Sequence, residues 1–193
     1  VAGVIHSAFG FQGQKCSAAS RVIVLESCYE KFKHRLSEAA ASLRIGSPED
    51  PSNKIGPVID EEAKIRLLQV IERNSSRIVS QLKLAPGLSE QGNFVPPTVF
   101  ESEDFHSELG QNEFFGPLVT LFRVPDLDAA IRAFNDVDYA LTGGVYSRAP
   151  RTLERAREDL EVGNLYINRG ITGALVGRQP FGGYKLSGVG AKA

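Results

Sequence analysis

The chain has 193 residues, of which 42% are apolar and 23% charged, and its formal net charge is −1 at pH 7. This composition is typical of a globular domain that can bury a core without disulfides. The charge balance gives no reason to expect nucleic acid or a membrane surface as a partner, and no apolar run is long enough to span a bilayer. Two cysteines cannot form a disulfide scaffold, so we expect a reducing compartment, the cytoplasm.

The two ends of the sequence look like the ends of an excised piece. The chain begins with Val1 and contains no methionine, and it finishes in a Gly-rich run over residues 188–193. We therefore expect residues 1–193 to form one domain of a longer polypeptide.

The first part of the chain predicts a helix, a strand and a second helix. Residues 1–9 are small and apolar, which is typical of the end of a buried helix, and residues 21–25 read as a strand. Ser27 and Glu30 match a capping box, and the helix behind them should stop by Gly46.

A loop rich in proline and glycine follows over residues 46–57. Asp60 then has the position of a helix cap, and the helix behind it presents Ile65, Leu68 and Ile71 at helical spacing. We expect these three side chains to form its buried face.

The second half becomes regular. The pattern predicts strands over 78–84, 94–100, 118–124, 140–147 and 165–168, with helices that start at Asp126 and Pro150, the latter ending at Gly163. Strands that alternate with helices indicate βαβ units, so we expect the α/β class, with a mostly parallel, twisted sheet flanked by helices. The last 24 residues are too rich in glycine for regular structure, and such a loop at the carboxyl end of a sheet suits a substrate wall.

Cys16 lies in a short bend with glycine before it and small residues after it, at the mouth of the first strand. A thiol there is a candidate nucleophile if Lys15, backbone N–H groups or the positive ring of a cofactor lower its pKa. The ordinary alternative is a small packing residue. We expect that role for Cys28, and surface or packing roles for the three scattered histidines.

A second stretch, Glu113-Phe114-Phe115-Gly116-Pro117, places a carboxylate just before a buried strand. A carboxylate can accept two hydrogen bonds from a vicinal diol such as that of a ribose. The alternative is an exposed turn glutamate beside two core phenylalanines.

A third stretch covers residues 179–188 and reads Gln-Pro-Phe-Gly-Gly-Tyr-Lys-Leu-Ser-Gly. It lacks the strand–loop–helix context of a phosphate-binding loop. A disordered tail is its alternative reading.

The three stretches, in this order and at these separations, resemble the catalytic domain of the aldehyde dehydrogenase superfamily over nearly the whole chain. Within that superfamily, residues 13–18 and 170–183 are similar to the 1-pyrroline-5-carboxylate dehydrogenase branch, also called L-glutamate γ-semialdehyde dehydrogenase. That branch occurs as a single enzyme and as one half of bifunctional proline-utilisation proteins.

The resemblance implies a mechanism and a cofactor. Cys16 would attack the aldehyde carbon to give a thiohemiacetal, hydride would pass to NAD+, and water would hydrolyse the resulting thioester. Glu113 would bind the nicotinamide ribose, and Phe115 would lie near the nicotinamide ring.

The resemblance also implies a substrate site for a small aldehyde. Ser17, Gly173 and Ala174 would hold its α-carboxylate, since a hydroxyl and backbone N–H groups make a small anion site. Phe181 would flank its aliphatic part.

By the same resemblance, the cofactor-binding domain, the general base and an oxyanion-hole residue would precede Val1, and a tail that joins subunits into a homo-oligomer would follow Ala193. The isolated chain is then expected to be inactive. Two other readings stay open: an aldehyde dehydrogenase for another aldehyde, and a non-catalytic domain that retains the fold.

Overall fold

The computed structural model describes residues 1–190, in which helices and strands alternate. The elements, with 3-10 helices marked η, are α1 (Ala2–Phe9), η1 (Gly10–Gly13), β1 (Arg21–Leu25), α2 (Glu26–Ala41), α3 (Glu61–Arg73), η2 (Ser75–Arg77), β2 (Ile78–Gln81), η3 (Leu88–Glu90), β3 (Thr98–Ser102), α4 (Glu108–Gln111), β4 (Leu118–Val124), α5 (Leu127–Asn135), β5 (Tyr139–Ala140), β6 (Thr142–Val145), α6 (Pro150–Asp159), β7 (Asn164–Ile167) and β8 (Tyr184–Lys185).

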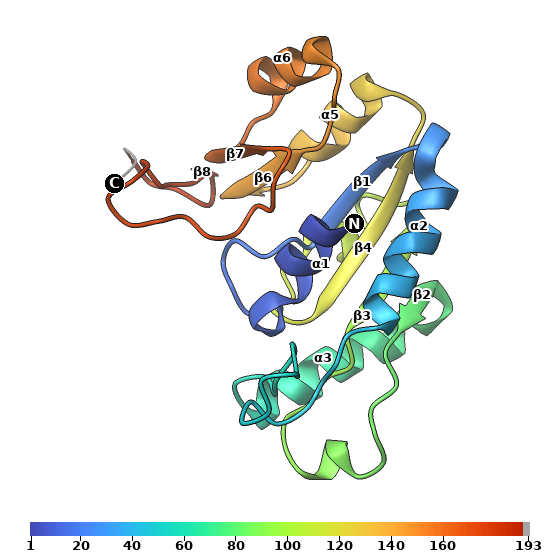
Figure 1. The fold of residues 1–193 in the computed structure, drawn as a ribbon. Coiled ribbons are helices and arrows are strands. Elements are labelled where there is room, and N and C mark those ends of the chain that lie inside the picture. Colours follow the sequence, from blue (N-terminus) through green and yellow to red (C-terminus); the bar gives the residue numbers. More distant parts are fainter. Residues whose placement is uncertain (191–193) are drawn as a thin grey trace.

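The main sheet has four strands in the order β1-β4-β3-β2. Strand β4 pairs in parallel with β1 and with β3, while β2 joins β3 antiparallel. Two small sheets stand beside it, a parallel pair of β6 and β7 and an antiparallel pair of β5 and β8 (Figure 1). The prediction of a mostly parallel sheet flanked by helices is confirmed.

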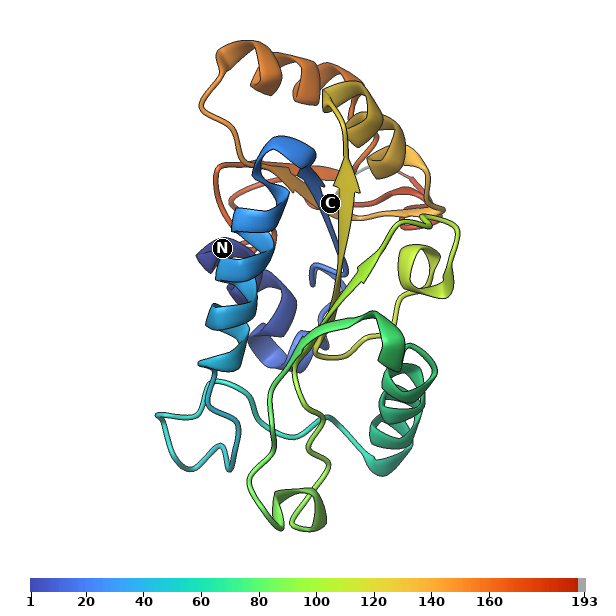
Figure 2. The same ribbon diagram turned by 90° about the vertical axis from the view of Figure 1, so that its right-hand side faces the viewer.

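The two faces of the main sheet carry separate cores. Val99 and Val119 belong to a cluster with residues of α1 and α2, whereas their neighbours Phe100 and Leu118 belong to a cluster with α3. This division follows from the two-residue period of a strand, which sends successive side chains to opposite faces. Figure 2 shows α2 on one side of the sheet and α3 on the other.

Two helix starts form as the sequence predicts. The side chain of Asp60 accepts a hydrogen bond from the Ala63 amide, and that of Asp126 accepts one from the Ala129 amide, both at 2.8 Å. The predicted capping box at Ser27 is wrong. Helix α2 begins at Glu26, directly after β1, so Ser27 lies inside the first turn and no side chain caps the helix.

The predicted buried face of α3 is also wrong in part. Ile65 and Leu68 are 50% and 37% exposed. The residues that α3 buries are Ala63, Leu67, Val70 and Ile71. Both sets satisfy the helical period, so the choice between them depends on where the second core cluster lies.

Two elements near the carboxyl end differ from the prediction. The strand expected over residues 140–147 is divided into β5 and β6, because the two pieces pair with different partners, β8 and β7. Helix α6 starts at Pro150 as expected but ends at Asp159, before Gly163.

None of the helices within residues 1–190 has the length and apolarity to cross a membrane.

Candidate active site

The segment that carries the thiol, residues 10–18, is called the nucleophile loop below. Its backbone reverses direction through three successive left-handed residues, Phe11, Gln12 and Gly13, with φ values of 58°, 58° and 66°. Left-handed backbone is unfavourable for residues with a side chain and persists where the surroundings hold it in place. The sharp reversal at the end of α1 is therefore maintained by tertiary contacts.

Gly13 is the tightest point of this loop. A Cβ atom built there would lie 2.1 Å from the carbonyl oxygen of Gly116. No other residue fits in this place without displacing backbone. The contact seats the nucleophile loop against residues 112–117, the cofactor loop, which carries Glu113.

Cys16 is presented on a turn. The Ala18 amide donates to the Lys15 carbonyl at 3.0 Å, which leaves Cys16 and Ser17 at the two central positions of the turn, and Cys16 is exposed. The Lys15 ammonium lies 4.7 Å from the centroid of the Phe11 ring. The Lys15 ammonium thus makes a cation–π contact with the Phe11 ring.

Glu113 and Phe115 lie in the cofactor loop, between α4 and β4. The Glu113 side chain is exposed, yet the protein around its carboxyl group removes enough water to raise the carboxyl pKa above its ordinary value. Phe115 has a φ of 53° and is 40% exposed. Arg66 of α3 supports the loop through a hydrogen bond of 2.6 Å to the Phe114 carbonyl.

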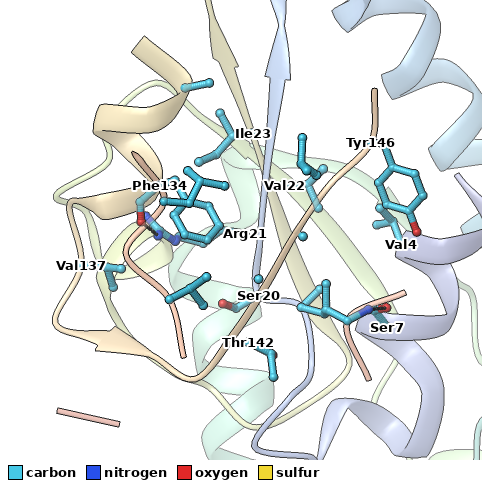
Figure 3. Close-up of a pocket in the computed structure, with 18 of the residues that line it drawn as sticks. Val4, Ser7, Ser20, Arg21, Val22, Ile23, Phe134, Val137, Thr142 and Tyr146 are labelled. Atoms are coloured by element: carbon cyan, nitrogen blue, oxygen red, sulfur yellow. Dashed lines mark hydrogen bonds between the residues drawn. The ribbon is translucent and has the colours of Figure 1, made fainter. Parts of the chain in front are cut away.

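A cavity of about 860 Å³ is lined by both Cys16 and Glu113. It lies between β1 and β6, with α1 and α2 supplying one wall and α5 and α6 another. Figure 3 shows Val22 and Ile23 of β1 at its centre, Phe134 on one side, and Val4 and Tyr146 on the other. The structure therefore brings the candidate nucleophile and the candidate ribose-binding carboxylate to one cavity.

The other predicted site residues stand outside this cavity within the described part of the chain. Ser17 and Phe115 flank its lining residues Cys16 and Glu113 without joining them. Residues 170–181, the substrate loop, contribute Gly170 and Ile171 to the lining.

The substrate loop then leaves the cavity, so Gly173, Ala174 and Phe181 are not gathered around Cys16 by residues 1–190. Gly173 has a φ of 89°, and apart from Gly173 and its two chain neighbours no heavy atom of residues 1–190 lies within 4 Å of the place where its Cβ would be.

The segment after the substrate loop is docked. Asn164 donates to the Gly182 carbonyl at 2.8 Å, and the Ser187 hydroxyl accepts from the Ala140 amide at 2.9 Å. Lys185 pairs with Glu161 at 3.0 Å. Gln179, at the start of the third stretch, donates to the Tyr166 hydroxyl at 3.1 Å. The alternative reading of residues 179–188 as a disordered tail is therefore wrong.

Ser7 is a site residue that the sequence reading missed. It is buried in α1 and lines the cavity; its carbonyl accepts from the Ala19 amide at 3.0 Å and its hydroxyl from the Ile171 amide at 3.1 Å. It thus joins the end of the nucleophile loop to the substrate loop. A hydroxyl residue near the end of a mostly apolar helix was the available signal.

The minor predictions for cysteine and histidine have mixed outcomes. Cys28 is exposed, and its Sγ donates to the Leu25 carbonyl at 3.4 Å, so the packing role expected for it is wrong. It lies in the first turn of α2, on the side that faces the cavity. His34 and His106 are surface residues that lie 3.5 and 3.4 Å from carboxylates. Residues 1–190 contain no cluster of three or more histidine, cysteine or acidic residues that could hold a metal ion.

An exposed cysteine on a turn and a carboxylate on the same cavity are consistent with what the family comparison finds. The chain belongs to the aldehyde dehydrogenase family, whose model matches residues 1–193.

The similar proteins within this family include 1-pyrroline-5-carboxylate dehydrogenases and proline utilization A. A 1-pyrroline-5-carboxylate dehydrogenase of Geobacillus sp. (strain WCH70) is 44% identical over 192 residues, which is 98% of this chain and 37% of the relative. Proline utilization A of Bdellovibrio bacteriovorus, in a crystal structure, is 50% identical with a TM-score of 0.93, over 99% of this chain and 20% of that one. A Thermus 1-pyrroline-5-carboxylate dehydrogenase with bound NAD is 46% identical with a TM-score of 0.90, over 97% and 36%. The chain thus spans little more than a third of the curated relative.

Proposed function

We propose that the chain is part of the catalytic domain of an enzyme that oxidises L-glutamate γ-semialdehyde to L-glutamate with NAD+, a step of proline catabolism. The observation that carries the proposal is the position of Cys16 and Glu113 on one cavity, with the thiol on an exposed turn. The substrate assignment is supported by the similarity to 1-pyrroline-5-carboxylate dehydrogenases.

Cys16 is the nucleophile in this proposal. Its thiolate sulfur bonds to the aldehyde carbon, and the carbonyl oxygen becomes the oxyanion of a thiohemiacetal. NAD+, when bound, supplies the hydride acceptor. The acyl group then stays on the Cys16 sulfur as a thioester, which water hydrolyses to the acid and the free thiol. The hydrogen-bonded turn at 15–18 holds the Cys16 backbone in place for both halves of the reaction.

Glu113 and Phe115 are proposed to hold NAD+. Glu113 lines the cavity, and a carboxylate there can accept two hydrogen bonds from the diol of a ribose. Phe115 is partly exposed on the same loop and offers an aromatic surface beside it. The hydrogen-bond acceptor and the aromatic ring of the cofactor loop therefore fit the nicotinamide ribose of this cofactor.

Ser17, Gly173 and Ala174 are proposed to bind the substrate carboxylate, with Phe181 against its aliphatic carbons. The open space around Gly173 and its positive φ leave backbone there accessible to an anion. The loop must come over Cys16 for this site to form, and Ser7 anchors its first residues on that side.

The proposal makes this chain one portion of a larger catalytic unit. Within residues 1–190, β1 pairs only with β4 and β6 only with β7, so two unpaired strand edges face the cavity. A further strand can pair with an edge of this kind. We propose that the rest of the polypeptide supplies such strands together with the cofactor-binding domain and the general base. The whole protein would then act in the cytoplasm as a homo-oligomer, and the isolated chain would produce no NADH.

The nucleophile is tested in the full-length protein with Cys16→Ser, and Cys28→Ser serves as the matched control. We expect Cys16→Ser to lower NAD+-dependent kcat by about three orders of magnitude or more, because the hydroxyl replaces a thiolate, and Cys28→Ser to leave it unchanged. Retention of activity by Cys16→Ser would show that the catalytic reading is wrong.

The substrate is tested with Gly173→Leu, which fills the proposed carboxylate site. We expect oxidation of the semialdehyde to fall far more than oxidation of propanal, which has no carboxylate. Equal losses for both aldehydes would remove the support for this substrate and leave an aldehyde dehydrogenase of another specificity.

A further inference from the structure

Two glutamines hold the nucleophile loop from either side of Gly13. The Gln14 Oε1 accepts a hydrogen bond from the Ile59 amide at 3.0 Å. With its carboxamide oriented to satisfy both groups, Gln12 accepts from the Gly56 amide at 2.7 Å and donates to the Phe11 carbonyl at 3.0 Å. Both tethers end on residues 56–59, which we call the clamp segment.

The clamp segment is itself fixed. Val58 is buried in the core cluster of α3, and its amide donates to the Asn93 carbonyl at 2.9 Å. Asp60 follows at once and caps α3. The clamp segment and α3 are therefore one continuous support whose position depends on the core.

The cofactor loop is bound to the same support. Arg66 of α3 donates to the Phe114 carbonyl, and Leu67 lies so close to Gly116 that a Cβ there would be 2.3 Å from a Leu67 methyl carbon. One support thus contacts the loop of Cys16 and the loop of Glu113.

The left-handed backbone at Phe11 and Gln12 shows why such tethers are needed. Two successive non-glycine residues in that region do not hold their conformation by local preference. Gln12 is one of the strained residues and Gln14 lies two residues before Cys16. The two hydrogen bonds therefore fix the backbone immediately before Cys16, and this backbone sets the position of the thiol.

We propose that the clamp segment and α3 set the position of the Cys16 sulfur relative to Glu113, and that Gln14 is a positioning residue for this thiol. The inference deepens the proposed function and rests on it, since it assumes that Cys16 is the nucleophile.

The test compares Gln14→Leu with Gln14→Glu in the full-length protein. Leucine removes the acceptor for the Ile59 amide, whereas glutamate keeps it at nearly the same length. We expect Gln14→Leu to lower kcat by about 10- to 100-fold with little change in KM for the aldehyde, because small displacements of a reacting group are costly. Gln14→Glu should stay within about threefold of the parent.

Gln81→Leu is the matched control. Gln81 donates to Thr98 in the main sheet, so this variant loses one glutamine side-chain hydrogen bond away from the cavity. We expect its kcat to be unchanged. The rate of Cys16 alkylation by iodoacetamide is the second readout, and it should change in Gln14→Leu and not in Gln81→Leu.

If Gln14→Leu does not fold, as judged by its melting transition, Gln12→Leu and Gln14→Glu carry the same comparison. Parental kcat and alkylation rates in Gln14→Leu, or in Gln12→Leu where Gln14→Leu does not fold, would overturn the inference. An active Cys16→Ser would instead overturn the proposed function, so the two failures are distinguishable.

Discussion

The nucleophile loop and the substrate loop are both turns with left-handed glycines, yet they differ in what surrounds them. At Gly13 a Cβ would lie 2.1 Å from a backbone oxygen, whereas a Cβ at Gly173 or Gly177 would have no heavy atom of residues 1–190 within 4 Å other than those of its own chain neighbours. Val176 is 104% exposed and Leu175 is 58% exposed. Within residues 1–190, the loop that carries the thiol is thus fixed by tertiary contacts, and the middle of the substrate loop is not.

The difference teaches which half of the proposed site is preorganised. The thiol is held by backbone contacts and by two side-chain tethers, which reduces the cost of aligning it with a substrate. The apolar residues at 175–176 are exposed, as in surfaces that mark an interaction site. We infer that the substrate wall acquires its final position only when further polypeptide or substrate covers it.

The largest expected difference between the two loops is in the free energy of unfolding when alanine replaces a glycine of each loop. Gly13→Ala should lower the free energy of unfolding by about 2–4 kcal/mol, since it adds a backbone clash to an unfavourable φ. Gly177→Ala meets only the φ penalty and should cost about 1 kcal/mol. Urea unfolding of both variants measures the difference. Equal losses would show that the two loops are held alike.

The second largest effect on stability is expected at Ser7, whose hydrogen bond to the Ile171 amide joins the nucleophile loop to the substrate loop. Ser7→Ala removes the hydroxyl that accepts a hydrogen bond from the Ile171 amide. It should lower the free energy of unfolding by about 1–3 kcal/mol. Amide exchange at Ile171 should speed up as the start of the substrate loop loosens. Ser42→Ala, which removes an exposed hydrogen bond to the Ala39 carbonyl, is the control and should cost less than about 0.5 kcal/mol. Unchanged exchange at Ile171 in Ser7→Ala would contradict the role of this serine.

Limited proteolysis compares the loops without mutation. Trypsin should cleave after Arg178, which is exposed in the substrate loop, about tenfold faster than after Lys15 in the nucleophile loop. The order of the fragments in a time course gives the answer by mass spectrometry. Earlier cleavage at Lys15 would reverse the comparison.

The smallest effect concerns the support beneath the cofactor loop. Hydrogen bonds from Arg73 and Asn74 lower the pKa of the Glu108 carboxyl below its ordinary value of 4.5. A carboxyl whose pKa is lower in the folded state stabilises the fold above its ordinary pKa, and this stability is lost as the pH falls through the folded value.

Because Glu108 is partly exposed, we expect less than about 1 kcal/mol between pH 7 and pH 3. Glu108→Gln should reduce the slope of stability against pH in that window, while Glu103→Gln, at an exposed position, serves as the control. Identical slopes for Glu108→Gln and the parent would show that the Arg73 contact adds no pH-dependent stability.

Much of the fold was available from sequence because its signals are local. The caps at Asp60 and Asp126, the first helical proline at Pro150 and the buried strand before Asp126 each depend on a few neighbouring residues. The misplaced cap at Ser27 and the wrong face of α3 were also local patterns. They failed because a direct strand-to-helix passage and the position of a core cluster decided between options that the pattern allowed equally.

By itself, the sequence determined most of the order of elements and the three stretches that carry the proposed chemistry. Only the tertiary structure decided that Cys16 and Glu113 share a cavity, that Ser7 joins two loops and that Gln14 reaches an amide 45 residues away. Contacts across such separations depend on how the layers pack, and packing is set by the whole core rather than by the residues that it brings together.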